Sequence, residues 1–273
     1  MTRLLFIVCG SRDDLVRMIN DDMQFVSSWF YQHRMYPNLA KTKVVSFGYK
    51  NPVDLHGRIW LHQSPNCAVG CGCKPLSQVY EIKYLGVMLD NKLTWGAQSK
   101  YLQSCLRKLN YVLFYASRQF SKFHLRKIYV ALFESRLRYG IINWGAASAN
   151  HLKPLSVLQK RTIRSVAGLR AGTSTGAEFI SLKILNLQQL YRHSAGCYVH
   201  KHKSRFGVHE KRKGGLRSGN AAASVPVCRK THSCNQASFA AAVFYNSLPA
   251  VLKGTVVANK FCKDLKEYLV LYE

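Results

Sequence analysis

Residues 79–95 read VYEIKYLGVMLDNKLTW, and along this stretch the pattern of apolar residues changes from strand-like to helical. Residues 79–89 alternate in part and carry Tyr, Ile and Val, which strands favour, so a strand or a tight hairpin is expected there. After Trp95 apolar residues recur at three- and four-residue steps, the period of an amphipathic helix. The sequence therefore predicts an α+β chain that is mostly α.

Upstream of this stretch, helical and extended patterns follow one another. Residues 4–8 are expected to form a buried strand, because the apolar run is too short for a signal peptide and acidic residues follow it. A helix is expected over residues 15–29 and a short strand over residues 44–47. Residues 50–78 contain Gly, Pro, Cys and His without a clear period, which predicts a loop or a distorted hairpin.

Downstream of Trp95, four apolar stripes predict the core faces of a helical bundle. The stripes are Leu102, Leu106, Leu109, Leu113 and Ala116; Leu125, Ile128, Leu132 and Phe133; Leu152, Leu155, Leu158, Ile163 and Val166; and Phe179, Leu182, Leu185 and Leu190.

Composition and period together predict four regions along the chain. Residues 1–95 form a mixed region, and residues 96–202 form the helical bundle. Residues 203–235 combine glycines with many bases, which is typical of a flexible basic linker. Residues 236–273 are expected to form a small helical segment.

The charge balance points to a polyanionic partner. Lys and Arg number 40 against 13 Asp and Glu, a formal charge of +27, and the only acids between Asp90 and Asp264 are Glu134, Glu178 and Glu210. Such a surface repels itself unless it meets a polyanion, so nucleic acid is the expected partner. A membrane partner is not expected, because no apolar run approaches the roughly 20 residues that span a bilayer. The sequence leaves the oligomeric state open.

The nine cysteines are odd in number and irregular in spacing, so free thiols are expected in a reduced, intracellular compartment, nuclear or cytoplasmic rather than secreted. Three groups resemble fragments of metal sites but lack the paired spacing of common zinc modules, so no metal site is expected. These groups are Cys67-x₃-Cys71-x-Cys73, Cys228-x₃-His232-x-Cys234, and Cys197 with His200 and His202.

Several short motifs follow one another along the chain, and their order matches that of a known protein family. They are VSSWF (26–30), NLAKTK (38–43), KYLGVMLD (83–90) with LTW (93–95), YGI (139–141) with WG (144–145), LQK (158–160) with IR (163–164), and NSLP (246–249). In this order they resemble the later part of non-LTR (LINE-type, Jockey-like) retrotransposon reverse transcriptases. The family usually has Trp where this chain has Tyr245.

The resemblance implies a palm remnant over residues 1–95, a helical thumb over 96–202 and a small helical tail. In such enzymes an aspartate pair and a third aspartate hold two Mg²⁺ ions for polymerisation. The resemblance places that pair just before Leu4, so no catalytic residue and no cofactor is expected in this chain. Asp13-Asp14 opens a predicted helix, where acids are ordinary capping and dipole residues, and Asp21-Asp22 lies further along the same helix.

Two further sets of residues carry implied roles in the palm. Lys41 and Lys43 resemble a segment near the incoming nucleotide, or else they form a cationic turn before a strand. Lys83, Tyr84 and Gly86 resemble the hairpin that grips the primer end, where Gly86 permits close backbone approach and Lys83 offers a phosphate contact. The alternative for this second set is a plain buried strand.

In the predicted thumb, bases on the polar faces of the helices would track phosphates without reading sequence. Candidate binding residues are Arg107, Lys108, Arg118, Lys122, Arg126, Lys127, Arg161 and Arg164, with further bases at Lys100, Arg136 and Arg138. A charged face is usually only solvated, but the scarcity of acids favours binding here.

Two functions are therefore expected from the sequence. The first is a fragment of a retrotransposon RNA-directed DNA polymerase, inactive alone but retaining a nucleic-acid-binding surface. The alternative is a stand-alone RNA- or DNA-binding module without enzymatic activity. The sequence does not distinguish RNA, DNA and hybrid duplexes as ligands.

Overall fold

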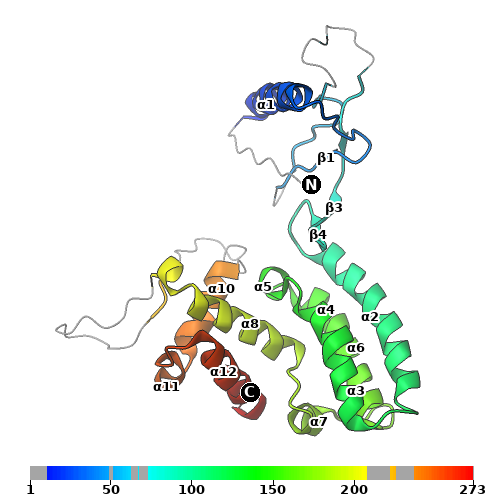
Figure 1. Cartoon of the computed structure of the whole chain (residues 1–273), viewed down its shortest axis with the longest axis vertical. Coiled ribbons are helices and arrows are strands. Elements are labelled where there is room, and N and C mark those ends of the chain that lie inside the picture. The colour runs from blue at the N-terminus through cyan, green and yellow to red at the C-terminus, as the bar shows by residue number, and fades with distance from the viewer. Residues whose placement is uncertain are drawn as a thin grey trace, which may run out of the picture. The chain divides into compact units, whose positions relative to one another are not determined.

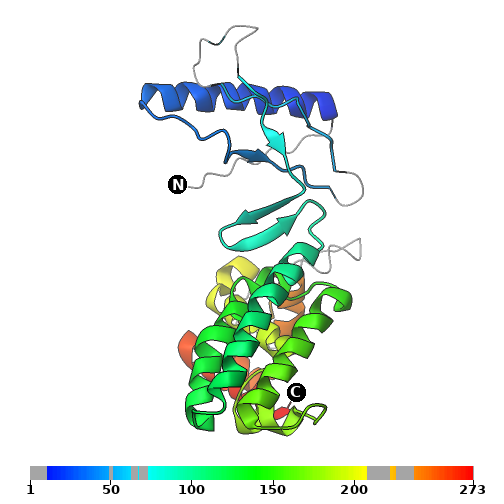
Figure 2. The same ribbon diagram turned by 90° about the vertical axis from the view of Figure 1, so that its right-hand side faces the viewer.

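The computed structural model describes residues 11–48, 52–62, 67, 73–207, 222–225 and 237–272. The chain divides into two compact units, Met1–Ala97 and Gln98–Glu273. It is mostly helical with a few short strands, as the sequence predicts (Figures 1 and 2). The strand expected over residues 4–8 and most of the expected basic linker lie outside the described residues, and the predicted division into four regions stays a prediction.

The first helix, α1 (Arg12–Gln32), confirms the helix predicted from the apolar period. It begins after Ser11, and Asp13 and Asp14 occupy its first turn, where a carboxylate offsets the positive end of the helix dipole. Asp14 pairs with Arg17 at 3.0 Å and Asp13 with Arg58 at 3.3 Å, all of them exposed. The two aspartates therefore open a helix, as expected.

The core of the first unit comes mainly from the segment that shows no period in the sequence. Leu55, Ile59, Leu61 and Leu76 are buried together, and apolar residues of α1 pack against them. Strand β1 (Lys43–Val44) is shorter than the predicted 44–47 and pairs in parallel with β2 (Ser77–Gln78), which lies inside the predicted loop.

Side chains supply the hydrogen bonds that regular strands would otherwise make in this core. The Gln78 amide accepts from the Leu55 N–H at 2.7 Å and donates to the Val53 carbonyl at 3.0 Å. The Asn20 amide in α1 accepts from the Trp60 N–H at 3.0 Å and donates to the Arg58 carbonyl at 2.9 Å. Buried backbone groups need such partners, so irregular chain can be buried here without a strand period.

Strands β3 (Glu81–Tyr84) and β4 (Val87–Asp90) form an antiparallel hairpin, which confirms the hairpin prediction. Its two-residue turn has φ of 44° at Leu85 and 85° at Gly86. Positive φ at both central residues is typical of the type I′ turn, whose twist matches that of paired strands.

Asp90, the last residue of β4, organises the chain that follows the hairpin. Its carboxylate accepts hydrogen bonds from the Thr94 N–H at 2.8 Å, the Thr94 hydroxyl at 3.2 Å and the Trp95 N–H at 2.8 Å. These bonds hold a turn in which Leu93 and Trp95 have positive φ. The Asp and Leu-Thr-Trp motifs noted in the sequence thus share a structural role.

The second unit is helical. The elements that the structure describes in it are α2 (Gly96–Ala116, beginning in the first unit), α3 (Lys122–Ile128), η1 (Tyr129–Glu134), α4 (Ser135–Arg138), α5 (Ile141–Trp144), α6 (Ala149–Ala167), α7 (Gly176–Ser181), α8 (Leu187–Lys201), η2 (Lys203–Phe206), α10 (Ala237–Ser247), α11 (Ala250–Lys253) and α12 (Ala258–Tyr272). Helices α2 and α6 are joined by side chains, because the Ser99 hydroxyl donates to the His151 carbonyl and the Thr162 hydroxyl donates to Asn110 Oδ1 at 3.1 Å.

A π-helical segment, η1, changes which residues of the second stripe are buried. Leu125, Tyr129, Phe133 and Leu137 are buried at four-residue steps, whereas Leu132 is 42% exposed. A π turn holds more residues than an α turn and so rotates the side chains that follow it. The prediction that Leu132 belongs to the core is therefore wrong.

Helix α8 packs against both α10 and α12 (Figure 1). It begins with a capping box, in which the Asn186 side chain accepts from the Gln189 N–H at 3.0 Å and the Gln189 side chain accepts from the Asn186 N–H at 2.9 Å. Cys197 of α8 and Cys262 of α12 form a disulfide, so the expectation of free thiols is wrong for this pair.

Two buried histidines lie among the described residues of this helical unit. His193 accepts from Arg138 Nη1 at 3.1 Å and donates from Nε2 to the Cys262 carbonyl at 3.0 Å, while Arg138 also pairs with the buried Glu134 at 2.7 Å. Burial, reinforced by the Arg138 charge, lowers the pKa of His193 to about 4. Burial also lowers the pKa of His200, which stacks on Phe261, to about 4.

These histidines predict a loss of stability on acidification. The unfolded chain takes up their protons near pH 6.5, whereas the folded chain resists until about pH 4, so the stabilisation present above pH 6.5 is lost between those values. Between pH 7 and pH 5 we expect the loss from His193 alone to be about 2 kcal/mol. Thermal melts at pH 7 and pH 5 measure it.

Matched variants distinguish protonation of the two buried histidines from other causes of acid destabilisation. The difference in melting temperature between pH 7 and pH 5 should shrink in the His193→Gln, His200→Gln double variant. It should persist in His124→Gln, because His124 is exposed. An unchanged difference in the double variant would show that these histidines do not govern the acid response.

Candidate nucleic-acid interface

Exposed bases and aromatic rings alternate along α2, the turn after it and α3. We call this set of residues the α2–α3 face, and it comprises Arg107, Lys108, Tyr111, Phe114, Tyr115, Arg118, Lys122, Phe123 and Lys127, all exposed. On α2 its members recur at three- and four-residue steps, which places them along one side of the helix. Lys122, Phe123 and Lys127 continue the same alternation of charge and ring on α3.

Ring and cation contacts hold the α2 part of this face together. The Tyr111 and Tyr115 rings lie 4.6 Å apart, and a hydrogen bond between the two side chains raises the pKa of Tyr111. Arg118 Cζ lies 5.0 Å from the centre of the Phe114 ring and 5.1 Å from that of Tyr115. On α3, Lys127 Nζ lies 4.2 Å above the Phe123 ring.

This combination of groups suits single or paired nucleic-acid strands. Arg and Lys attract phosphates, and exposed aromatic rings offer flat platforms on which bases stack. Neither α2 nor α3 contains an acidic residue. Glu134, the next acid along the chain, is buried and paired with Arg138, so its charge does not offset the face.

Five of the eight thumb bases predicted from the sequence lie on the α2–α3 face, and the other three lie elsewhere. Arg126 is half-buried, and its Nε donates to the Leu182 carbonyl. Arg164 Nε donates to the Thr173 carbonyl at 2.7 Å, and Arg161 is exposed on α6. Each of the two bonded guanidinium groups keeps further N–H donors, so their predicted phosphate contacts stay predictions.

The predicted binding residues of the first unit fall on two local structures. Lys41 is exposed in a turn where its N–H bonds to Asn38 Oδ1 at 3.1 Å, and Lys43 Nζ donates to Ser77 Oγ at 2.7 Å. Lys83, Tyr84 and Gly86 lie on the β3–β4 hairpin. Its tip is exposed, with Leu85 at 63%, so this segment is not a plain buried strand.

The aromatic members of the α2–α3 face were missed by the sequence analysis, which considered only the bases. These rings lie on the exposed side of their helices, outside the leucine stripe that marks the buried side; they are Tyr111, Phe114, Tyr115 and Phe123. Large rings at polar-face positions, three or four residues from Arg or Lys, are the signal that could have identified them.

Polymerase chemistry would need carboxylates that converge on metal ions. Within the ranges that the structure describes, the only group of three or more possible metal ligands is His62, Cys67 and Cys73, which contains no carboxylate. The acids of α1 are exposed, and Asp13 and Asp14 pair with arginines.

Part of this chain is similar in sequence to a class of enzyme that copies RNA into DNA. About a third of the chain is related to the RNA-directed DNA polymerases of non-LTR retrotransposons. Over 97 residues it is 36% identical to the RNA-directed DNA polymerase from mobile element jockey of Drosophila funebris. It is 29% identical over 97 residues to the probable RNA-directed DNA polymerase from transposon X-element of Drosophila melanogaster.

Each match covers 34% of this chain but only 10% and 11% of the respective relative, so the chain spans about a tenth of the length of the curated relatives it matches. No family model matches the chain. No solved structure matches it either. None of the described helices is both long enough and apolar enough to cross a membrane.

Proposed function

We propose that this chain is a nucleic-acid-holding part of a non-LTR retrotransposon RNA-directed DNA polymerase, and that it does not polymerise by itself. In this proposal residues 1–95 correspond to part of the palm and residues 96–202 to the thumb. The observation that carries the proposal is the α2–α3 face, an acid-free surface of bases and stacking rings in a chain related to such polymerases.

The proposed mechanism is retention of a template–product duplex. Arg107, Lys108 and Lys122 would contact successive phosphates, which gives affinity without sequence preference. Tyr111 and Tyr115 would stack against exposed bases or sugars at the edge of the duplex. Their positions on one side of α2 would let the helix lie along the nucleic acid.

The β3–β4 hairpin is the proposed contact with the primer end. Gly86 has no side chain at the exposed tip, so a nucleic-acid strand can approach the backbone closely. Lys83, exposed on β3, would supply a phosphate contact beside it.

Fluorescence anisotropy with the full chain tests the proposal. A labelled RNA–DNA hybrid of about 20 base pairs, a single-stranded RNA and a DNA duplex serve as probes. We expect binding with a dissociation constant of about a micromolar or tighter at low salt. No binding of any probe at low salt would contradict the proposal.

A stand-alone RNA- or DNA-binding module is the second candidate, supported by the second unit, which forms a compact body with its own core. It predicts the same binding. Sequencing the native transcript upstream of the Met1 codon separates the two: an open frame that continues into an aspartate pair favours the polymerase, and an unrelated exon favours the module.

A further inference from the structure

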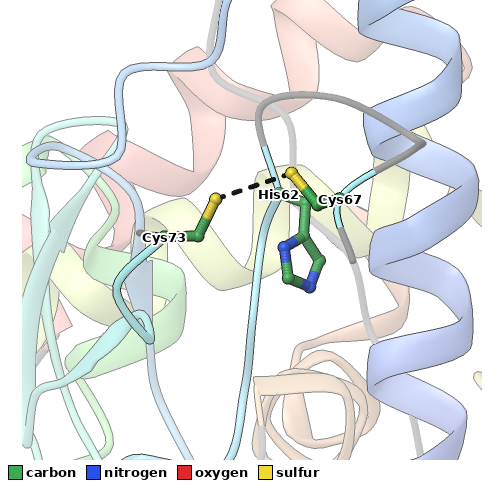
Figure 3. A group of neighbouring side chains, drawn as sticks. All are labelled: His62, Cys67 and Cys73. Atoms are coloured by element: carbon green, nitrogen blue, oxygen red, sulfur yellow. Dashed lines mark hydrogen bonds between the residues drawn. The ribbon is translucent and has the colours of Figure 1, made fainter. Parts of the chain in front are cut away.

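His62, Cys67 and Cys73 converge in the first unit (Figure 3), and none of them is among the residues assigned a role in nucleic-acid binding. Their possible ligand atoms all lie within 4.8 Å of one another, and each side chain is half-buried. The Sγ atoms of Cys67 and Cys73 lie 3.8 Å apart. A disulfide would need about 2.0 Å, so the two thiols share a hydrogen bond, drawn dashed in Figure 3, and no disulfide.

The fold explains why His62 and Cys73 meet. Trp60 and Pro75 form an antiparallel bridge, and the Leu76 N–H donates to the Ile59 carbonyl at 2.8 Å. In an antiparallel pair, moving two residues forward on one strand and two back on the other reaches the next opposed pair on the same face. His62 and Cys73 occupy that position, beside the Trp60–Pro75 bridge.

The neighbouring core fixes both strands of this arrangement. Ile59, Leu61 and Leu76 are at most 4% exposed and belong to one buried cluster packed against α1. The Trp60 ring is stacked nearly parallel to the His62 ring, with centroids 6.2 Å apart. Two of the three side chains are therefore anchored directly beside a rigid core.

The spacing of the atoms fits a tetrahedral zinc ion. Zinc–sulfur bonds of about 2.3 Å at a tetrahedral angle put two sulfur ligands about 3.8 Å apart. The Sγ–Sγ distance in the protein matches this value without any movement. Two thiolates and one imidazole are also among the commonest donors for Zn²⁺, and the two thiolate charges would balance the ion.

We propose that His62, Cys67 and Cys73 bind one Zn²⁺ ion, which closes the chain between residues 62 and 73. A fourth donor would complete the tetrahedron. The cysteine spacing alone did not indicate this site, because the third ligand, His62, lies five residues before Cys67 and is brought beside Cys73 by the Trp60–Pro75 bridge. Binding requires the thiolate forms, so the ion displaces two thiol protons.

Metal analysis of the full chain tests the proposal. The protein is produced in zinc-supplemented medium and purified with a reductant and without chelators, and its zinc content is measured by mass spectrometry. We expect about one zinc per chain, and a loss of at least tenfold in affinity in Cys67→Ser, Cys73→Ser and His62→Ala. Cys105→Ser, which removes a free and half-buried thiol on α2, should retain the metal.

Cobalt substitution gives a reading that does not depend on the variants folding. Co²⁺ added to the metal-free wild-type chain should produce the absorption of a tetrahedral thiolate complex, and Zn²⁺ should abolish it. Wild-type protein that holds neither ion would overturn the proposal. So would zinc retained in a Cys67→Ser, Cys73→Ser double variant.

Discussion

Replacing Arg107, Lys108 and Lys122 with glutamate is expected to weaken binding of an RNA–DNA hybrid by about a hundredfold or more. In the proposed complex each substitution would remove one phosphate contact and add a charge that repels the nucleic-acid backbone. Even about 1 kcal/mol per site gives a factor above 100 for three sites, since 1.4 kcal/mol is tenfold. All three side chains are exposed, so the fold should survive, and an unchanged melting temperature verifies this.

The control carries the same change in net charge on other helices. Lys201, Lys260 and Lys263 are exposed on α8 and α12, and their replacement with glutamate also lowers the charge by six. We expect this control to lose less than about tenfold, because only long-range attraction is reduced. Equal losses in the two triple variants would mean that binding follows net charge and not the α2–α3 face.

The substitution Gly145→Ala is expected to lower the free energy of unfolding by about 3 kcal/mol. A Cβ at this position would overlap the Tyr191 ring and would lie 2.6 Å from the Ile141 carbonyl oxygen. The carbonyl belongs to the backbone of α5, and the fully buried Trp144 precedes Gly145, so the chain has little room to adjust. Denaturant-induced unfolding of the purified variant measures the loss.

Gly176→Ala provides the matched control. An added Cβ at Gly176 meets no atom within 4 Å, and this glycine occupies the first position of α7 with a negative φ. The control should be neutral or stabilising by about 0.5 kcal/mol, because alanine restricts the unfolded chain. If Gly145→Ala were equally mild, the close packing of α5 on α8 at this point would be wrong.

Periodic patterns predicted the helices of this chain well, since the burial of one helix side leaves a direct trace in sequence. The leucines of α2 and the apolar residues of α6 are buried largely as expected. The stripe through Leu132 failed because a π turn depends on local hydrogen bonding and leaves no period to detect. Helix period therefore indicates the buried face only where the helix stays regular.

The core of the first unit could not be predicted for a different reason. Leu55, Ile59 and Leu61 lie in irregular chain whose backbone bonds to the side chains of Asn20 and Gln78. Such partners lie far away in the sequence, so the hydrogen bonds that they make leave no periodic pattern of apolar residues. The disulfide between Cys197 and Cys262 likewise depends on α8 packing against α12.

The bases of the candidate interface could be predicted from the sequence, but their tertiary contacts could not. The scarcity of acids pointed to Arg107, Lys108, Arg118, Lys122 and Lys127. The structure shows all five exposed, and Arg118 and Lys127 lie over aromatic rings. The side on which each base lies follows from helix period. Bonds such as that of Arg126 to the Leu182 carbonyl arise from tertiary contacts, so sequence could not separate these bases from the exposed ones.

The salt dependence of hybrid binding tests the central claim most directly. The logarithm of the association constant is measured against the logarithm of salt concentration for the wild type and for both triple variants. The slope should be steep in the wild type and should become shallower by about 0.7 to 0.9 per lost phosphate contact in the Arg107, Lys108, Lys122 variant. It should stay nearly unchanged in the Lys201, Lys260, Lys263 variant. A flat wild-type slope, or equal slopes in the two variants, would contradict the α2–α3 face as the site that holds nucleic acid.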